Sequence, residues 1–230
     1  MGGQGCGSRG RQSFRWPVAG QHAQRSHPMT SVPVADGASR WDFAYDAEWY
    51  IPLPAADLLR REPGIGEQWV SAAVEHYAER SPLTDGDREA LAFTAEGILG
   101  LAGNAAVQLW FVPRGAYSDV LIEITVSAAA DLDIPAILTE IATLPDSTAS
   151  ELTALETDSH GKGFLLRRTS AVLLDDGEAR PIANWTVMLS DGESAIMIEA
   201  MGSTLEPFAL MEEQIPKIIA GITLPSGRPA

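Results

Sequence analysis

Two Asp-Gly pairs in the last third of the chain constrain its fold more than any other feature. They lie at Asp176-Gly177 and Asp191-Gly192 and separate three strand-like segments, 163–174, 180–189 and 193–201. An Asp-Gly pair between such segments favours a tight hairpin turn, because glycine adopts positive φ without a Cβ penalty. The sequence therefore predicts three consecutive antiparallel strands.

Earlier segments extend this pattern. Residues 106–112 and 119–127 are strand-like and are separated by turn residues at 113–116, which predicts a further hairpin. Residues 41–46 alternate aromatic side chains with small or polar ones, the period of a half-buried strand. Since neighbouring strands are joined by tight turns, the predicted sheet is mainly antiparallel.

Apolar residues at helical spacing predict helices between these strands. A helical hairpin is expected over 64–103, and Thr84 with Asp87 resembles a capping box at the start of its second helix. A short helix is expected over 134–144, and a final helix begins near Thr204, which Pro216 should kink or split. The predicted fold class is α+β, a mainly antiparallel sheet with helices packed on it.

The 230 residues suffice for one domain with tails. We expect the domain at 41–224. Residues 1–40 are expected to be a disordered leader and residues 225–230 a disordered tail. Residues 1–28 hold four arginines and no acidic residue, with no apolar run long enough for a secretory signal. We hypothesise that 1–28 is an over-extended gene start and that Met29 is the true one.

Composition excludes several classes of partner. The net charge is −15, so residues 29–230 carry −19, and this charge opposes binding to nucleic acid or to an anionic membrane. The single cysteine cannot form an internal disulfide or a cysteine-based zinc site. No apolar run reaches the roughly 20 residues that cross a bilayer.

Three short motifs carry chemically useful residues, but each lacks a required member. Gly161-Lys162-Gly163 has neither the earlier glycine nor the following Ser or Thr of a phosphate-binding loop, which favours a flexible connector. Asp158-Ser159-His160 contains the residue types of a hydrolytic triad, yet adjacent loop residues cannot usually converge. His76 and Glu79 lie one helical turn apart without further ligands, which favours a solvated helix face over a metal site.

A candidate polar ligand site lies on the sheet. Glu123 and Glu199 belong to the polar faces of their strands and can meet Arg167 or Arg168, depending on the strand register. Glu123, Arg168 and Glu199 form the candidate set, because paired acids and bases can bind a polar ligand or transfer protons. Ordinary cross-strand charge pairing is the structural alternative, and we favour it.

The last third resembles the end of a Mog1/PsbP-like domain. The matching residues are the hairpin Pro181–Leu189 with Ser194–Ala200, the helix that carries Phe208, and the apolar ending Ile218–Leu224. The resemblance covers 104–224, whereas the helical pair at 64–103 departs from the family pattern. The whole chain also resembles actinobacterial proteins that share an opening like Trp49–Pro54.

Both resemblances imply an accessory or adaptor domain, and neither supplies catalytic residues to carry over. We therefore predict a soluble, cytoplasmic domain that works by contact with an unidentified protein partner, with no catalysis, cofactor or metal of its own. The alternative is a small-molecule-binding or enzymatic domain that uses the polar face of the sheet. Self-association through an edge strand or a helix face is a third possibility.

Overall fold

The computed structural model describes residues 29–36, 39–101, 103–128, 132–173 and 177–224, and these form two antiparallel sheets with six helices. The predicted segments 1–28 and 225–230, and part of the turn at 175–178, lie outside these residues. In spatial order the large sheet contains β3 (Tyr50–Pro52), β4 (Val107–Phe111), β5 (Leu121–Ala128), β9 (Ser194–Gly202), β8 (Ala179–Ser190), β7 (Gly161–Leu173) and β6 (Ser147–Thr157).

The small sheet begins with residues from the N-terminal part of the chain. It consists of β1 (Met29–Asp36), β2 (Ser39–Asp46) and β10 (Ile222–Thr223), with β2 in the centre. Residues 29–36, which fall within the leader expected over 1–40, form β1 and pair along their whole length with β2. The sequence hides this strand because Pro33 lies in its middle, and a proline within a run argues against a central strand.

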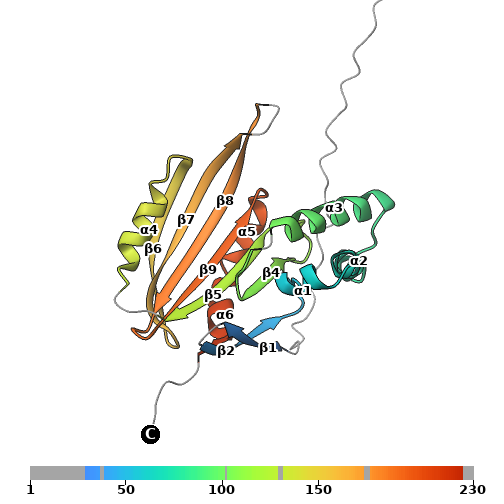
Figure 1. The fold of residues 1–230 in the computed structure, drawn as a ribbon. Coiled ribbons are helices and arrows are strands. Elements are labelled where there is room, and N and C mark those ends of the chain that lie inside the picture. Colours follow the sequence, from blue (N-terminus) through green and yellow to red (C-terminus); the bar gives the residue numbers. More distant parts are fainter. Residues whose placement is uncertain (1–28, 37–38, 102, 129–131, 174–176, 225–230) are drawn as a thin grey trace, which may run out of the picture.

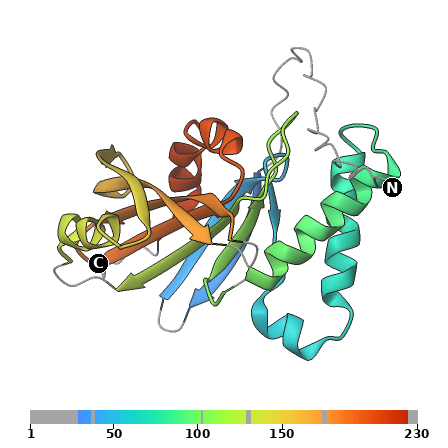
Figure 2. The same ribbon diagram turned by 90° about the horizontal axis from the view of Figure 1, so that it is seen from above.

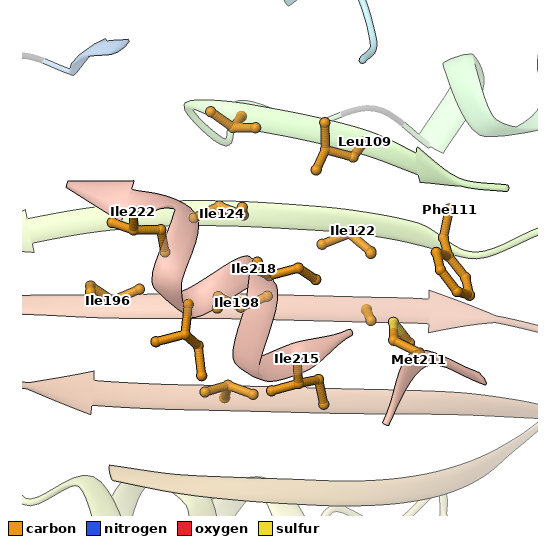
Figure 3. Packing of buried hydrophobic residues seen from close by; sticks show 14 of the residues in the cluster. Leu109, Phe111, Ile122, Ile124, Ile196, Ile198, Met211, Ile215, Ile218 and Ile222 are labelled. Carbon is orange, nitrogen blue, oxygen red and sulfur yellow. The ribbon is translucent and has the colours of Figure 1, made fainter. Parts of the chain in front are cut away.

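The first face of the large sheet carries the main core. Leu109, Ile122, Ile124 and Ile198 lie on this face and are almost fully buried. Helices α5 (Glu206–Met211) and α6 (Ile215–Gly221) pack on this face, and Figure 3 shows Met211, Ile215 and Ile218 against the side chains of the strands. Trp41 and Phe43 of β2 belong to the same cluster, so the small sheet closes this core.

The second face is covered in two places. Helices α2 (Ile65–Ala78) and α3 (Asp85–Leu101) pack against Trp110 and Leu121, while α4 (Ile134–Ala142) packs against Leu166 and Met188. Figure 1 shows α4 beside β6 and the α2–α3 pair at the opposite end of the sheet, and Figure 2 shows α2 and α3 side by side. The strip of sheet between these two clusters carries the candidate site.

Local signals set the helix boundaries much as predicted. Thr84 Oγ1 accepts a hydrogen bond from the Asp87 amide at 3.2 Å, and an Asp87 carboxylate oxygen accepts one from the Thr84 amide at 2.8 Å, which confirms the capping box. The predicted split of the last helix is also confirmed, because α6 begins at Ile215 and holds Pro216 in its first turn.

Two further elements were not predicted. Helix α1 (Ala56–Arg61) is only six residues long and buries none of them, so it has no apolar stripe to detect. Strand β6 is the edge of the large sheet, and most of its side chains are exposed or half-buried. An edge strand with so little burial loses the alternation that marks a strand in sequence.

Candidate functional site

Four polar side chains form a row across the second face. The strand register places Gln108 opposite Glu123, and Glu123 opposite Glu199. Thr186 follows on the other side of Glu199. Gln108 and Thr186 are buried and both glutamates are half-buried. This polar row, as we call these four residues, separates the cluster under α2–α3 from the cluster under α4.

The two glutamates differ in their surroundings. Glu123 Oε1 accepts hydrogen bonds from the Gln108 amide nitrogen at 2.5 Å and from the Gly103 backbone at 3.3 Å, which suit a charged carboxylate. Burial, and then the negative charge of Glu123, raise the pKa of Glu199 above its ordinary value. Glu199 therefore takes up a proton at a higher pH than an ordinary glutamate does.

Replacing Glu199 with glutamine is expected to make the protein more stable at pH 7. A carboxyl whose pKa is higher in the folded state stabilises the fold below its unfolded pKa, and this stability is lost as the pH rises through the folded pKa. Wild type should therefore lose free energy of unfolding between pH 4.5, about the ordinary pKa of glutamate, and pH 7 relative to Glu199→Gln.

Urea unfolding at a series of pH values measures this difference. Glu156→Gln, on an exposed side chain of β6, is the matched control and should follow the wild-type profile. A Glu199→Gln profile parallel to that of wild type would contradict a raised pKa of Glu199 in the folded protein.

The structure brings two members of the candidate set together and leaves the third apart. Arg168 lies on the same face, but its strand neighbour is Asn184, one row away from Glu199. Its guanidinium donates to the Asp146 carboxylate at 3.0 Å and to Ser147 at 3.3 Å. Arg168 thus ties the start of β6 to β7.

The alternative arginine, Arg167, lies on the first face. Its guanidinium stands 5.0 Å from the centre of the Trp185 ring and donates to Glu212 at 2.6 Å. Arg167 therefore ties the segment after α5 to the sheet and is separated from Glu123 and Glu199 by the sheet itself.

The glycine-lysine-glycine motif belongs to a hairpin, not to a flexible connector. Gly161 has a φ of 72° where β6 turns into β7, and Gly163 lies within β7 opposite Leu189. A Cβ at Gly163 would lie 2.2 Å from the Met188 carbonyl oxygen. Close packing of β7 on β8 therefore explains the second glycine.

The two histidines considered as functional candidates are both packed into the fold. A ring nitrogen of His160 lies 2.9 Å from the Ile222 carbonyl oxygen, so this buried side chain joins the β6–β7 turn to β10. His76 is half-buried instead of fully solvated as expected, and burial followed by the charge of Arg80 lowers its pKa to about 4. Glu75 beside it pairs with Arg88 at 2.7 Å.

The helical hairpin also carries a surface groove that its sequence does not predict. It has a volume of about 640 Å³, and we call it the hairpin groove. Its floor is formed by the apolar side chains of Val70, Val74, Ala92 and Leu99. Its rim carries four glutamates and one arginine, namely Glu67, Glu75, Glu89, Glu96 and Arg88. The only sequence signal was the run of glutamates on both helices, which resembles an ordinary solvated surface.

A second cavity, of about 520 Å³, lies at the open end of β4. Strand β3 ends at Pro52, which pairs with Leu109, so the start of β4 extends beyond its neighbour. Gly103 and Gln108 line this cavity and also hold Glu123. The cavity therefore adjoins the polar row.

Within the described ranges, no three histidine, cysteine, aspartate or glutamate side chains are grouped so as to hold a metal ion. None of the helices in that part of the chain combines the length and the apolar character needed to span a bilayer.

No family model matches this chain, and no curated protein matches its sequence. The solved structures that are similar to it include the following three. Cyanobacterial PsbP from Synechocystis is 8% identical with a TM-score of 0.41, covering 89% of this chain and 98% of that one. LpqN of Mycobacterium tuberculosis, involved in cell envelope biogenesis, is 15% identical with a TM-score of 0.43, covering 85% and 91%. The Ran-binding protein Mog1p of Saccharomyces cerevisiae is 9% identical with a TM-score of 0.41, covering 86% and 96%.

The similar structures include a PsbP and Mog1p, the proteins after which the predicted resemblance is named. The predicted α+β class is confirmed by the two antiparallel sheets and the helices packed on them. Cell envelope biogenesis is a property of LpqN, and Ran binding is a property of Mog1p.

Proposed function

We propose that this chain is an accessory domain that acts by binding another protein through the outward face of α2 and α3, with no catalysis of its own. The observation that carries the proposal is the hairpin groove, an apolar floor inside a charged rim. Protein contact surfaces share this arrangement of an apolar centre and a polar border. Phe93 follows the groove-lining Ala92 in α3 and is 79% exposed, so the same helix carries a further large apolar side chain in contact with solvent.

The contacts of the polar face support a structural role for it. Glu123 is held by Gln108 and Gly103, and Arg168 is held by Asp146. These hydrogen bonds fix the side chains to neighbouring elements of the fold, as cross-strand polar pairs do. The helical hairpin, by contrast, exposes apolar side chains on its outward face.

Affinity capture of the full chain from its native host tests the proposal. Phe93→Asp places a charge on the hairpin, and Leu173→Asp does the same on β7, at a side chain that is 75% exposed. A partner protein should be recovered equally with wild type and Leu173→Asp, and at least tenfold less with Phe93→Asp. Circular dichroism and Tm confirm that both variants are folded. Failure to recover a partner with wild type, or equal loss with both variants, contradicts the proposal.

A small molecule bound beside the polar row is the second candidate function. It is favoured by the cavity at the open end of β4, whose volume lies within the usual range of ligand sites. A ligand that binds only the folded protein raises its Tm, and above the dissociation constant this rise grows with the logarithm of the ligand concentration. A rise with wild type that is lost in Glu123→Gln favours this candidate, whereas protein binding by α2–α3 alone gives no rise with any small molecule.

The cytoplasmic location, the absence of nucleic-acid and membrane partners and the formation of homo-oligomers stay predictions. The net charge of −15 supports the exclusion of nucleic acid and anionic membranes, because like charges repel.

A further inference from the structure

The charge of the hairpin groove is largely uncompensated. Arg88 is committed to Glu75 across the groove, with 2.7 Å between the guanidinium and the carboxylate. Glu67, Glu89 and Glu96 are exposed on the rim, and no basic side chain of the described residues lies within ion-pair distance of them. The rim therefore presents three free negative charges around an apolar floor.

We propose that the occupant of the hairpin groove is a cationic amphipathic helix of the partner protein, an inference that rests on the proposed function. Its apolar side chains pack on Val74, Ala92 and Leu99, and its lysines or arginines pair with the glutamates of the rim. Helices commonly bind in this way, with an apolar face in the groove and charges along its borders.

The shape of the groove favours a helix over an extended segment. Two neighbouring helices present ridges and a groove between them, into which the side-chain ridges of a third helix fit. On α2 the lining residues extend from Gly66 to Glu75, about 14 Å at the helical rise per residue. A helix of about three turns covers this length, with basic residues at spacings of three and four along its sides.

Charge complementarity separates this occupant from a second copy of the chain. The chain carries −15, so another copy brings net negative charge to an already negative rim. A cationic segment gains from the same field, both in its rate of association and in the pairs that it forms. The arginines of residues 1–28 make that stretch a competing source of positive charge within the chain itself.

Fluorescence anisotropy with the full chain and a designed helical peptide tests the proposal. The probe is an 18-residue peptide with lysines on one face of the helix and leucines on the other. It forms about five helical turns, which is longer than the groove. Its control carries glutamates in place of the lysines. The protein variants are the double reversal Glu89→Lys with Glu96→Lys, and the matched double reversal Glu156→Lys with Glu193→Lys, on exposed residues of β6 and of the β8–β9 turn.

Wild type should bind the lysine peptide and not the glutamate peptide, and 0.5 M salt should weaken the binding because it screens exposed charges. The groove reversal should lower the affinity at least tenfold, while the sheet reversal leaves it within twofold. Equal loss in both double variants, or no binding by wild type, overturns the proposal. A synthetic peptide of residues 1–28 that binds as tightly as the lysine peptide also overturns it, because the occupant is then the chain itself.

Failure of this inference is distinguishable from failure of the proposed function. If Phe93→Asp loses the native partner while the lysine peptide does not bind, the protein contact stands and its cationic helical occupant is wrong. If the native partner binds equally well to Phe93→Asp, the proposed function is wrong whatever the peptide does.

Discussion

Replacing Gly163 with alanine is expected to lower the free energy of unfolding by about 3 kcal/mol, the upper end of the usual cost of overpacking. The added Cβ would lie 2.2 Å from the Met188 carbonyl oxygen and 2.6 Å from a side-chain carbon of Leu189. The leucine can change rotamer, but the carbonyl is fixed by the pairing of β7 with β8. Urea unfolding followed by circular dichroism measures the loss.

The control for this substitution is Gly97→Ala, which should have the opposite sign. A Cβ at Gly97 meets no atom within 4 Å, and the residue lies inside α3. Alanine there should stabilise the protein by about 0.5–1 kcal/mol, because glycine loses more conformational freedom on folding. Two glycine-to-alanine changes with the same sign would contradict the packing described for β7 and α3.

Replacing Trp110 with alanine is expected to cost about 3–5 kcal/mol. Its side chain is fully buried between the sheet and the helical hairpin, with ring centres 5.3 Å from Tyr77 and 6.1 Å from Trp69. Its indole nitrogen also donates to the Ser118 carbonyl oxygen at 2.9 Å, so truncation leaves a cavity and an unpaired buried acceptor. Thermal and urea unfolding measure the total loss.

Amide hydrogen exchange locates this effect. Trp110→Ala should increase exchange in α2 and α3 more than in β7 and β8, because Trp110 anchors the hairpin cluster. Trp110→Phe keeps an aromatic ring against Tyr77 and should lose less stability than alanine does. An increase in exchange that is uniform over the whole protein would contradict a local anchoring role.

The sheet hairpins and the longer helices could be predicted from the sequence because their signals are local. Asp191 followed by Gly192 defines the β8–β9 turn, where Gly192 has a φ of 93° and Asp191 accepts backbone hydrogen bonds from residues 193 and 194. Thr84 and Asp87 define the start of α3 in the same way. Such signals depend only on residues three or four apart in the chain.

The unpredicted strands depend on partners that are distant or weakly patterned. Strand β1 is recognisable only through its pairing with β2, and β6 exposes most of its side chains at the edge of the sheet. His160, expected in an ordinary loop, is buried because β10 lies against it some sixty residues later in the chain. Tertiary contacts of this kind decide burial without leaving a local pattern.

The candidate site could be predicted only in part for the same reason. Alternation placed Glu123 and Glu199 on polar faces, but the register that sets them side by side, and adds Gln108 and Thr186 to the row, is a property of paired strands. Register also places Arg168 opposite Asn184, one row away from Glu199, and its guanidinium donates to Asp146 instead. The hairpin groove depends on how α2 and α3 pack together, and neither helix shows it alone.

Photo-crosslinking in the native host tests the central claim, protein binding through the α2–α3 face, most directly. A photoreactive phenylalanine analogue replaces Phe93 in the full chain, and in a second strain it replaces Leu173, which is similarly exposed. Irradiation should give one discrete adduct with another protein from position 93 and none from position 173. A discrete adduct from position 173 alone, or no adduct from either position, would contradict the claim.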